Sequence, residues 1–324
     1  MEQNSAAHRA GLVTDLQHAA LFALAYFAGS ELGYALSLGP SVGGTFWPPA
    51  GISLAAFLAS RFRSWPLLVI GGAAANFTSD VVHGQLLQAS IGFTAANLAE
   101  PVLGAFLVRL ALPGPFTLTR LPELGVLILV VALASTPVAA AFGAFIAERF
   151  TPDPPGFAAG WRTWWVGDMV GALVVAPFAL RLITGWSRRG TITTRTWLEA
   201  LAFAVAVWSI THVIFDAPPT SLAMPFLVFP VLLWGSLRLG VIGVGAALCL
   251  VVALTAHDTA AGLGPFAAQH LSLGDRLIAL QIYVGVMAIS FHGLAVLWEE
   301  RMRTAAALRL AHSGLTARHR RIVE

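Results

Sequence analysis

Four carboxylates lie inside apolar stretches of this 324-residue chain, where an ionised side chain is costly and needs a partner. They are Glu31, Asp80, Glu100 and Asp168, and the asparagines Asn76 and Asn97 accompany them. Asn76 precedes Asp80 by four residues and Asn97 precedes Glu100 by three, so each pair shares one face of a helix. Groups of this kind bind ligands, or they cross-link helices through hydrogen bonds. The sequence leaves both interpretations open.

Aromatic residues and prolines lie close to these carboxylates in the sequence. Trp164 precedes Asp168 by one helical turn, and Gly167 and Gly171 have the small-xxx-small spacing that lets a neighbouring helix approach closely. Asp168 is therefore expected to face protein, although tryptophans near a span end also serve as interfacial anchors. The predicted ligand-binding or signal residues are Glu31, Trp47, Pro48, Pro49, Asn76, Asp80, Asn97, Glu100, Trp164, Trp165 and Asp168.

The elements that carry these residues are predicted to be membrane-spanning helices. Hydrophobic residues make up 57% of the chain and charged residues 11%, whereas soluble domains have about 25% charged residues. Apolar runs long enough to cross a bilayer recur along the sequence. We predict an all-α integral membrane protein of about ten spans, at residues 16–38, 46–60, 65–83, 88–110, 121–147, 161–183, 196–215, 220–237, 240–256 and 276–298.

The arginines predict the topology, because positively charged residues gather in cytoplasmic loops. If the N-terminus is cytoplasmic, all arginines except Arg149, Arg162 and Arg276 lie on the cytoplasmic side, and both termini are cytoplasmic. Glu31, Asn76, Asp80 and Asp168 then lie in the outer half of the bilayer, with Glu100 near mid-depth. This asymmetry predicts an outward-facing polar cavity walled by spans 1, 3, 4 and 6, with the Trp-Pro-Pro turn at its rim.

Three segments are expected: a cytoplasmic N-terminal segment 1–15, a membrane domain 16–298 and a cytoplasmic helix 299–324 leading toward a PAS or output domain. Pro48 precedes Arg61 by thirteen residues and Pro225 precedes Arg238 by thirteen, which suggests a parallel repeat of spans 1–4 and 7–10. The C-terminal helix could pair in a homodimer. Its heptad seam, however, is interrupted by Arg301 and by a threonine.

The composition argues against several other classes. The basic side chains are inner-loop anchors, so we predict the lipid bilayer as a partner and no nucleic acid. No cofactor or metal is predicted, because there is one cysteine and no ligand cluster. Axial haem ligation by His212, His257 and His292 is conceivable, but His292 lies at a different depth. Neither a phosphate-binding glycine loop nor a nucleophile elbow is present, so no enzyme activity is predicted for this chain.

Three runs resemble the first-described membrane-associated sensor domain of bacteria, the MASE group. They are Phe46–Ser53, Asn97–Glu100 and Trp164–Asp168 continuing to Pro177, and Phe229–Trp234 with Arg238 is similar to the second half of that family. The resemblance covers residues 12–300. It implies a sensory input module in the bacterial inner membrane, at the N-terminus of a histidine kinase or diguanylate cyclase. It supplies no signal molecule.

Two further functions remain open beside a sensory domain. A secondary transporter is favoured by the span count, the proline-broken helices and the possible repeat. The outward bias of the buried polar groups argues against it, because alternating access usually needs polar groups on both sides of a central site. An intramembrane enzyme is disfavoured because the sequence offers no paired nucleophile and base.

Overall fold

The computed structural model describes residues 2–37, 46–152, 154–185, 193–217, 224–267 and 272–323. All regular secondary structure in these ranges is helical. The predicted inner loop 184–195, with Arg188 and Arg189, lies largely outside them, as do Thr220–Ala223 at the start of the predicted eighth span.

Proline fixes the start of many of the helices, since its missing N–H costs nothing in the first turn. It occupies the first or second position of the helices that begin at residues 48, 65, 121, 136, 225 and 229. In chain order the helices are α1 (Glu2–Ala35), α2 (Pro48–Ala59), η1 (Phe62–Ser64), α3 (Trp65–Val82), α4 (Leu87–Ala111), α5 (Leu121–Val130), η2 (Val131–Ser135), α6 (Thr136–Phe150), α7 (Phe157–Gly185), α8 (Thr194–Phe215), η4 (Pro225–Val228), α9 (Phe229–Arg238), α10 (Gly240–Ala260) and α11 (Leu273–Val323).

The protein is an all-α membrane protein, as predicted. Within the described ranges, six helical stretches are long and apolar enough to cross a bilayer: α4, α5 to α6, α7, α8, α10 and the first part of α11. The helices Pro48–Ala59 and Pro225–Arg238 are apolar but shorter. Each predicted span contains a helix within the described residues, yet length and composition support six crossings, so the count of ten is not shown.

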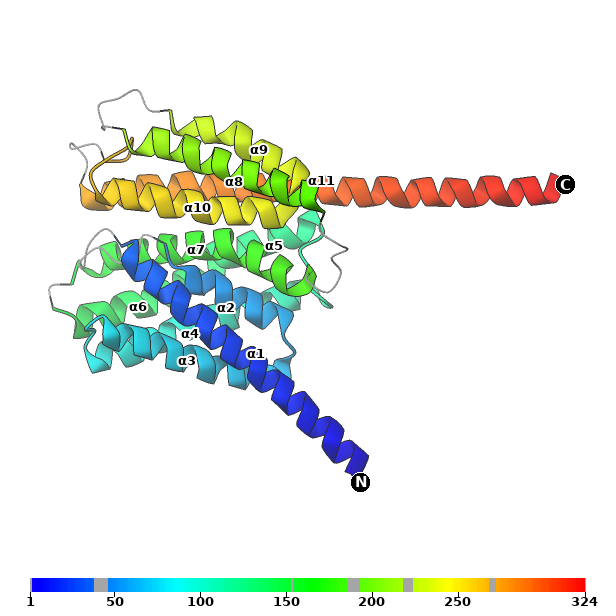
Figure 1. Ribbon diagram of the computed structural model, residues 1–324. Helices are drawn as coiled ribbons and strands as arrows, with labels where there is room; N and C mark the ends of the chain where they lie inside the picture. Colours follow the sequence, from blue (N-terminus) through cyan, green and yellow to red (C-terminus); the bar gives the residue numbers. More distant parts are fainter. Residues whose placement is uncertain are drawn as a thin grey trace.

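The helices form two groups that meet at α7 (Figure 1). In the first group α1 packs on α2 and α3, while α4 packs on α2, α3 and α6. In the second group α10 packs on α8, α9 and α11. Helix α7 contacts α2 and α6 on one side and α10 and α11 on the other. Both termini extend from the same end of the bundle (Figure 1). Whether the groups are related as a repeat stays a prediction.

Glycines bring α2 against α7 at close range. A Cβ added at Gly171 would collide with the carbonyl oxygen of Trp47, and one at Gly51 would lie 2.6 Å from the Cβ of Val175. Side chains larger than glycine would therefore push the two helices apart. Gly171 lies one turn after Asp168, so this contact fixes the start of α2 beside that carboxylate.

A π-helical turn, η2, joins α5 to α6 and is stabilised by α7. In such a turn the carbonyl of Ala132 would accept from the N–H of residue 137, but Pro137 has none. The indole Nε1 of Trp165 donates to that carbonyl instead, at 2.9 Å. The indole of Trp161 donates to the carbonyl of Pro137, also at 2.9 Å. These two tryptophans thus tie α7 to the irregular segment.

Two arginines, Arg63 and Arg109, stabilise the end of the first group at which α2 ends. The guanidinium of Arg109 donates to the carbonyls of Phe57 and Leu58, at 3.1 Å each, and to that of Ser60. These are the carbonyls that the end of α2 leaves without intrahelical partners. Arg63 pairs with Asp15 of α1 at 3.7 Å.

Candidate functional site: a buried polar cluster

The centre of the site is the side chain of Asn76 on α3, which joins three helices. Its Oδ1 accepts from the hydroxyl of Tyr26 on α1 at 2.8 Å and from Nδ2 of Asn97 on α4 at 2.9 Å. Its own Nδ2 donates to Asp80 at 2.8 Å and to Thr94 at 3.0 Å. Asn76 and Tyr26 are fully buried, so every hydrogen bond here replaces one to water. The spacings Asn76–Asp80 and Thr94–Asn97 place both members of each pair on the same helix face.

A second set of contacts extends the cluster toward the ends of α1 and α3. The hydroxyl of Tyr34 donates to Asp80 at 2.8 Å, and the ring of Tyr34 stacks on His83 with centroids 3.8 Å apart. Glu31 accepts from the hydroxyl of Ser79 at 2.8 Å, and its other oxygen lies 3.7 Å from Nε2 of His83. The Glu31 side chain is 37% exposed, so this rim reaches the surface.

The third part of the cluster is a pair of carboxyl groups. Glu100 on α4 and Asp168 on α7 are buried, at 4% and 6% exposure, and their carboxyl groups lie close enough to interact with each other. A hydrogen bond between the two groups would require a proton on one of them. The hydroxyl of Tyr26 is close enough to Asp80, Glu100 and Asp168 to interact with all three electrostatically. The four predicted carboxylates therefore converge on one region, formed by α1, α3, α4 and α7.

The predicted aromatic and proline residues lie around this region rather than within its hydrogen bonds. Trp47 contacts Tyr34 edge-on, with centroids 5.7 Å apart, and Pro48 and Pro49 are buried at the start of α2. Trp164 packs on Phe93 at 5.1 Å, between α4 and α6. Trp165 supports η2 through Ala132. A role in ligand binding stays a prediction for each of them.

Several residues of the cluster were not predicted from the sequence. Tyr26 and Tyr34 on α1 and Thr94 on α4 complete the hydrogen bonds of Asn76 and Asp80. A signal for them did exist, because Tyr26, Ser30 and Tyr34 follow one another at intervals of four and so form a polar stripe on one face of α1.

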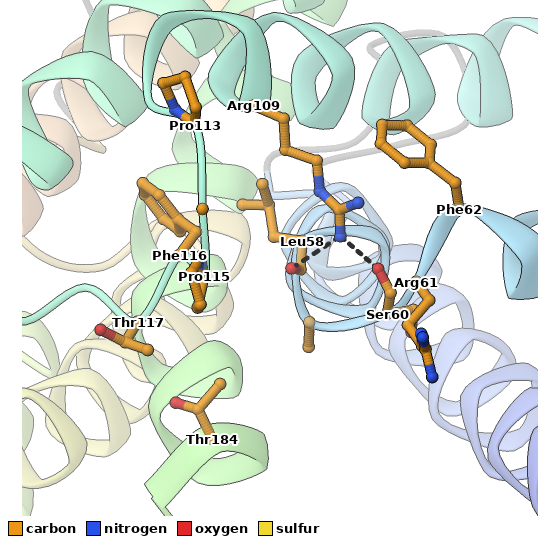
Figure 2. Close-up of a pocket in the computed structure, with 12 residues that line it drawn as sticks. Leu58, Ser60, Arg61, Phe62, Arg109, Pro113, Pro115, Phe116, Thr117 and Thr184 are labelled. Carbon is orange, nitrogen blue, oxygen red and sulfur yellow. Dashed lines mark hydrogen bonds between the residues drawn. The ribbon is translucent and has the colours of Figure 1, made fainter.

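A pocket of about 490 Å³ lies at the other end of α2. Figure 2 shows Arg109 reaching across it to the end of α2, with Phe62 and Phe116 on its walls. The guanidinium lies 4.6 Å from the ring centroid of Phe62 and is held by the carbonyls of α2. The pocket is therefore far along α2 from the polar cluster. An opening at the cluster itself stays a prediction.

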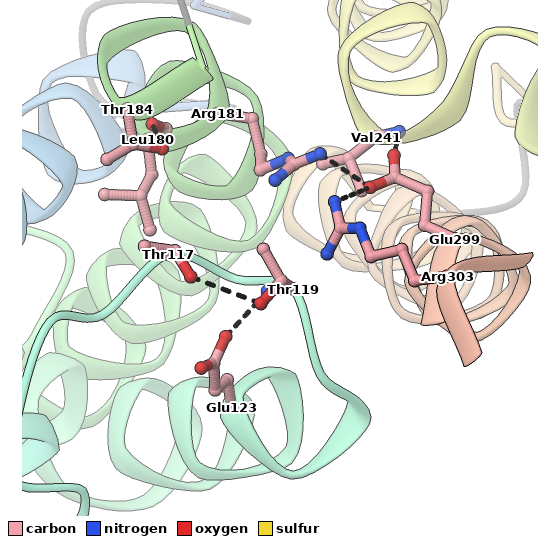
Figure 3. Close-up of polar contacts among 9 residues, drawn as sticks. All are labelled: Thr117, Thr119, Glu123, Leu180, Arg181, Thr184, Val241, Glu299 and Arg303. Carbon is pink, nitrogen blue, oxygen red and sulfur yellow. Dashed lines mark hydrogen bonds and ion pairs between the residues drawn. The ribbon is translucent and has the colours of Figure 1, made fainter. Parts of the chain in front are cut away.

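At the point where α11 extends beyond the other helices, two adjacent glutamates, Glu299 and Glu300, contact the neighbouring helices. Arg181 at the end of α7 donates to Glu299 at 2.5 Å, and Arg303 donates to the same oxygen at 3.1 Å (Figure 3). The other oxygen of Glu299 accepts from the backbone N–H of Val241, in the first turn of α10, at 3.4 Å.

Glu300 makes the matching contact with α5. It accepts from the backbone N–H of Leu121, the first residue of that helix, at 3.0 Å. Carboxylates are stabilised at helix N-termini, where backbone N–H groups lack partners. The two glutamates therefore bind α11 to α5, α7 and α10, helices from both groups. We call Glu299, Glu300 and Arg181 the exit clamp.

Comparisons with known proteins identify the family of the chain. A profile of the MASE1 family matches residues 18–302. A stretch of 134 residues is 27% identical to the probable diguanylate cyclase DgcE of Escherichia coli (strain K12), covering 41% of this chain and 12% of that protein. No solved structure matches. Because the profile covers most of the chain, the protein belongs to the MASE1 family of membrane sensory input domains found in signalling proteins.

Proposed function

We propose that this domain receives a signal at the buried polar cluster and passes it through α7 and α11 to a cytoplasmic kinase or cyclase. The observation that carries the proposal is the convergence of Asp80, Glu100 and Asp168, from three helices, on one buried polar region. A ligand or a membrane-protein partner that binds one packing of these helices better than another shifts the domain between the two.

The path out of the cluster runs along one helix. Asp168 and Arg181 are both on α7, thirteen residues apart, which is roughly 20 Å at the rise of an α-helix. Arg181 contacts Glu299 on α11, the helix that continues beyond the bundle. His292 of α11 also lies on α7, 3.3 Å from the carbonyl of Val174. A shift or rotation of α7 therefore changes contacts of α11 directly.

The topology is part of the same proposal. We infer ten crossings with both termini in the cytoplasm of a bacterial cell, which places the exit clamp at the cytoplasmic face and the polar cluster toward the outside. The positions of Arg63, Arg109, Arg181 and Arg238 at one end of the bundle support this orientation. Pairing of two copies through residues 299–323 belongs to the proposal as well.

The test uses a full-length parent protein that carries this domain and an output domain. Asp168→Asn and Glu100→Gln should abolish the change in output activity on stimulation while membrane insertion stays normal. Glu199→Gln is the matched control, because Glu199 pairs with Arg238 on α8 and α9, outside the cluster. Wild-type responses in both cluster variants would overturn the proposal.

A secondary transporter is the alternative function. The broken helix α5–η2–α6 and the internal prolines Pro101 and Pro177 support it, since interrupted helices frame the substrate sites of many transporters. Uptake of a solute into proteoliposomes containing the domain would favour this alternative over the sensory function.

A further inference from the structure

Among the residues that the structure describes, the buried carboxyl pair of Glu100 and Asp168 has no positively charged partner. Oδ2 of Asp168 is buried and has no hydrogen-bond donor among the described residues. The ion pairs formed by those residues include neither Asp80 nor Glu100 nor Asp168. Asp80 differs from the pair, because Tyr34 and Asn76 donate to both of its oxygens.

The ionisable groups on the surrounding helices do not supply the missing charge. The nearest ones are acidic or neutral: Tyr26 on α1 and Asp80 on α3. Helices α2 and η2 contain no ionisable side chain. Of the remaining groups, Arg109 of α4, Arg181 of α7, and His292 and Glu299 of α11 bind elsewhere. Others lie toward helix ends, namely Glu123 of α5, Glu148 and Arg149 of α6, Arg162 of α7, His257 and Asp258 of α10, and Asp275 and Arg276 of α11. The thiol of Cys249 on α10 carries no positive charge in either protonation state.

From this arrangement we propose that Glu100 and Asp168 together bind one positive charge, a proton or a single monovalent cation, and that its binding is the event that the domain senses. Two ionised carboxylates in contact inside an apolar bundle repel each other, and one bound charge removes that repulsion. An anionic ligand is disfavoured, because it would meet three carboxylates. The inference rests on the sensory role proposed for this cluster.

Binding at this pair would alter the separation of α4 and α7. Pro101 follows Glu100 directly and removes a backbone hydrogen bond to the carbonyl of Asn97, so α4 is weakened beside the pair. Without the bound charge, repulsion between the carboxylates pushes α7 away from α4. Because Arg181 lies on α7, this displacement reaches the exit clamp.

The test measures thermal unfolding of the whole domain in lipid nanodiscs. The midpoint is recorded from pH 5 to pH 9, and at fixed pH with Na⁺, K⁺ or choline as the cation at constant ionic strength. Infrared difference spectra record the carboxyl C=O band in the same samples. If a proton binds, the midpoint falls with rising pH for every cation, and the protonated-carboxyl band disappears. If a metal cation binds, Na⁺ or K⁺ raises the midpoint and choline does not.

Asp168→Asn and Glu100→Gln should each remove this dependence, and either one alone suffices if the other does not fold. Asp258→Asn is the matched control, because Asp258 is equally buried, at 6% exposure, but lies on α10 outside the cluster. A wild-type midpoint and spectrum that respond neither to pH nor to cation overturn the inference, as does a response that both variants retain. If the isolated domain binds no charge while Asp168→Asn still abolishes signalling in the parent protein, the inference fails and the sensory function stands.

Discussion

The exit clamp makes a quantitative prediction about the contact between Arg181 and Glu299. The perturbation is a double-mutant cycle of Arg181→Gln, Glu299→Gln and the double variant. Glu299 also contacts Arg303 and Val241, so Glu299→Gln alone removes more than one interaction. Those other contacts are lost equally in the single and the double variant. The cycle therefore isolates the free energy of coupling between the two side chains.

The magnitude follows from the burial of the pair. The side chain of Arg181 is 16% exposed and that of Glu299 is 22% exposed, and their atoms lie 2.5 Å apart. Exposed ion pairs contribute about 0.2–1 kcal/mol, whereas hydrogen bonds to charged groups in less exposed sites contribute about 1.5–3 kcal/mol. We expect a coupling energy between these ranges, about 1–2 kcal/mol, which corresponds to a change of roughly 5- to 30-fold in an equilibrium constant.

The assay is equilibrium unfolding in mixed micelles, with the fluorescence of the chain's ten tryptophans as the signal. The control is a double-mutant cycle of Arg63 and Asp15, whose charged atoms lie 3.7 Å apart. Because the side chain of Arg63 is 60% exposed, we expect a coupling energy below about 0.5 kcal/mol there. If the Arg181–Glu299 coupling is as small as that of the control, α11 is not held by this contact and the path from α7 to α11 has no energetic basis.

Two further predictions concern the packing of α7. Trp165→Phe removes the donor to the half-buried carbonyl of Ala132 and should lower the free energy of unfolding by about 1–3 kcal/mol in the same unfolding assay. An unchanged value would show that η2 needs no support from α7. Gly171→Ala should lower the free energy of unfolding by about 1–3 kcal/mol, because the added Cβ would collide with the carbonyl of Trp47. Gly125→Ala is the control: its Cβ would meet open space, so the free energy of unfolding should stay the same or rise slightly. Equal effects of the two alanines would refute the tight contact between α2 and α7.

The helical fold and the position of its elements could be predicted from apolar runs and from arginine spacing. The start of α2 at Pro48 and the end of α9 at Arg238 follow from local chemistry. The number of crossings could not be fixed, because α2 has only twelve residues and its ability to cross depends on its neighbours.

The candidate site could be predicted in part. The helix-face pairs Asn76–Asp80 and Asn97–Glu100 identified two walls of the cluster, because three- and four-residue spacing is a local property. Glu100 and Asp168 were expected around one cavity, but their direct interaction was not predicted, because the depth of each residue in the bilayer does not specify which side chains pair. The stripe of Tyr26, Ser30 and Tyr34 marks a polar face of α1, but the hydrogen bond of Tyr26 to Asn76 depends on how α1 packs on α3.

The contacts of the exit clamp could not be predicted from the sequence either. In the sequence, Glu299 and Glu300 are the first charged residues after a predicted span, a position that is common where a helix enters the cytoplasm. Their role as acceptors for the first turns of α10 and α5 depends on three helices meeting at one point. The π-helical turn at Val131–Ser135 is similar, because Pro137 indicates a weak point but does not indicate which side chain supports it.

Helix α11 is continuous from Leu273 to Val323, a rod of 51 residues and roughly 75 Å. A continuous helix transmits rotation about its axis as well as displacement along it. Each residue added or removed rotates the part of the chain that follows by about 100°. Any partner fused to its far end would therefore work only at certain linker lengths, recurring with the helical period.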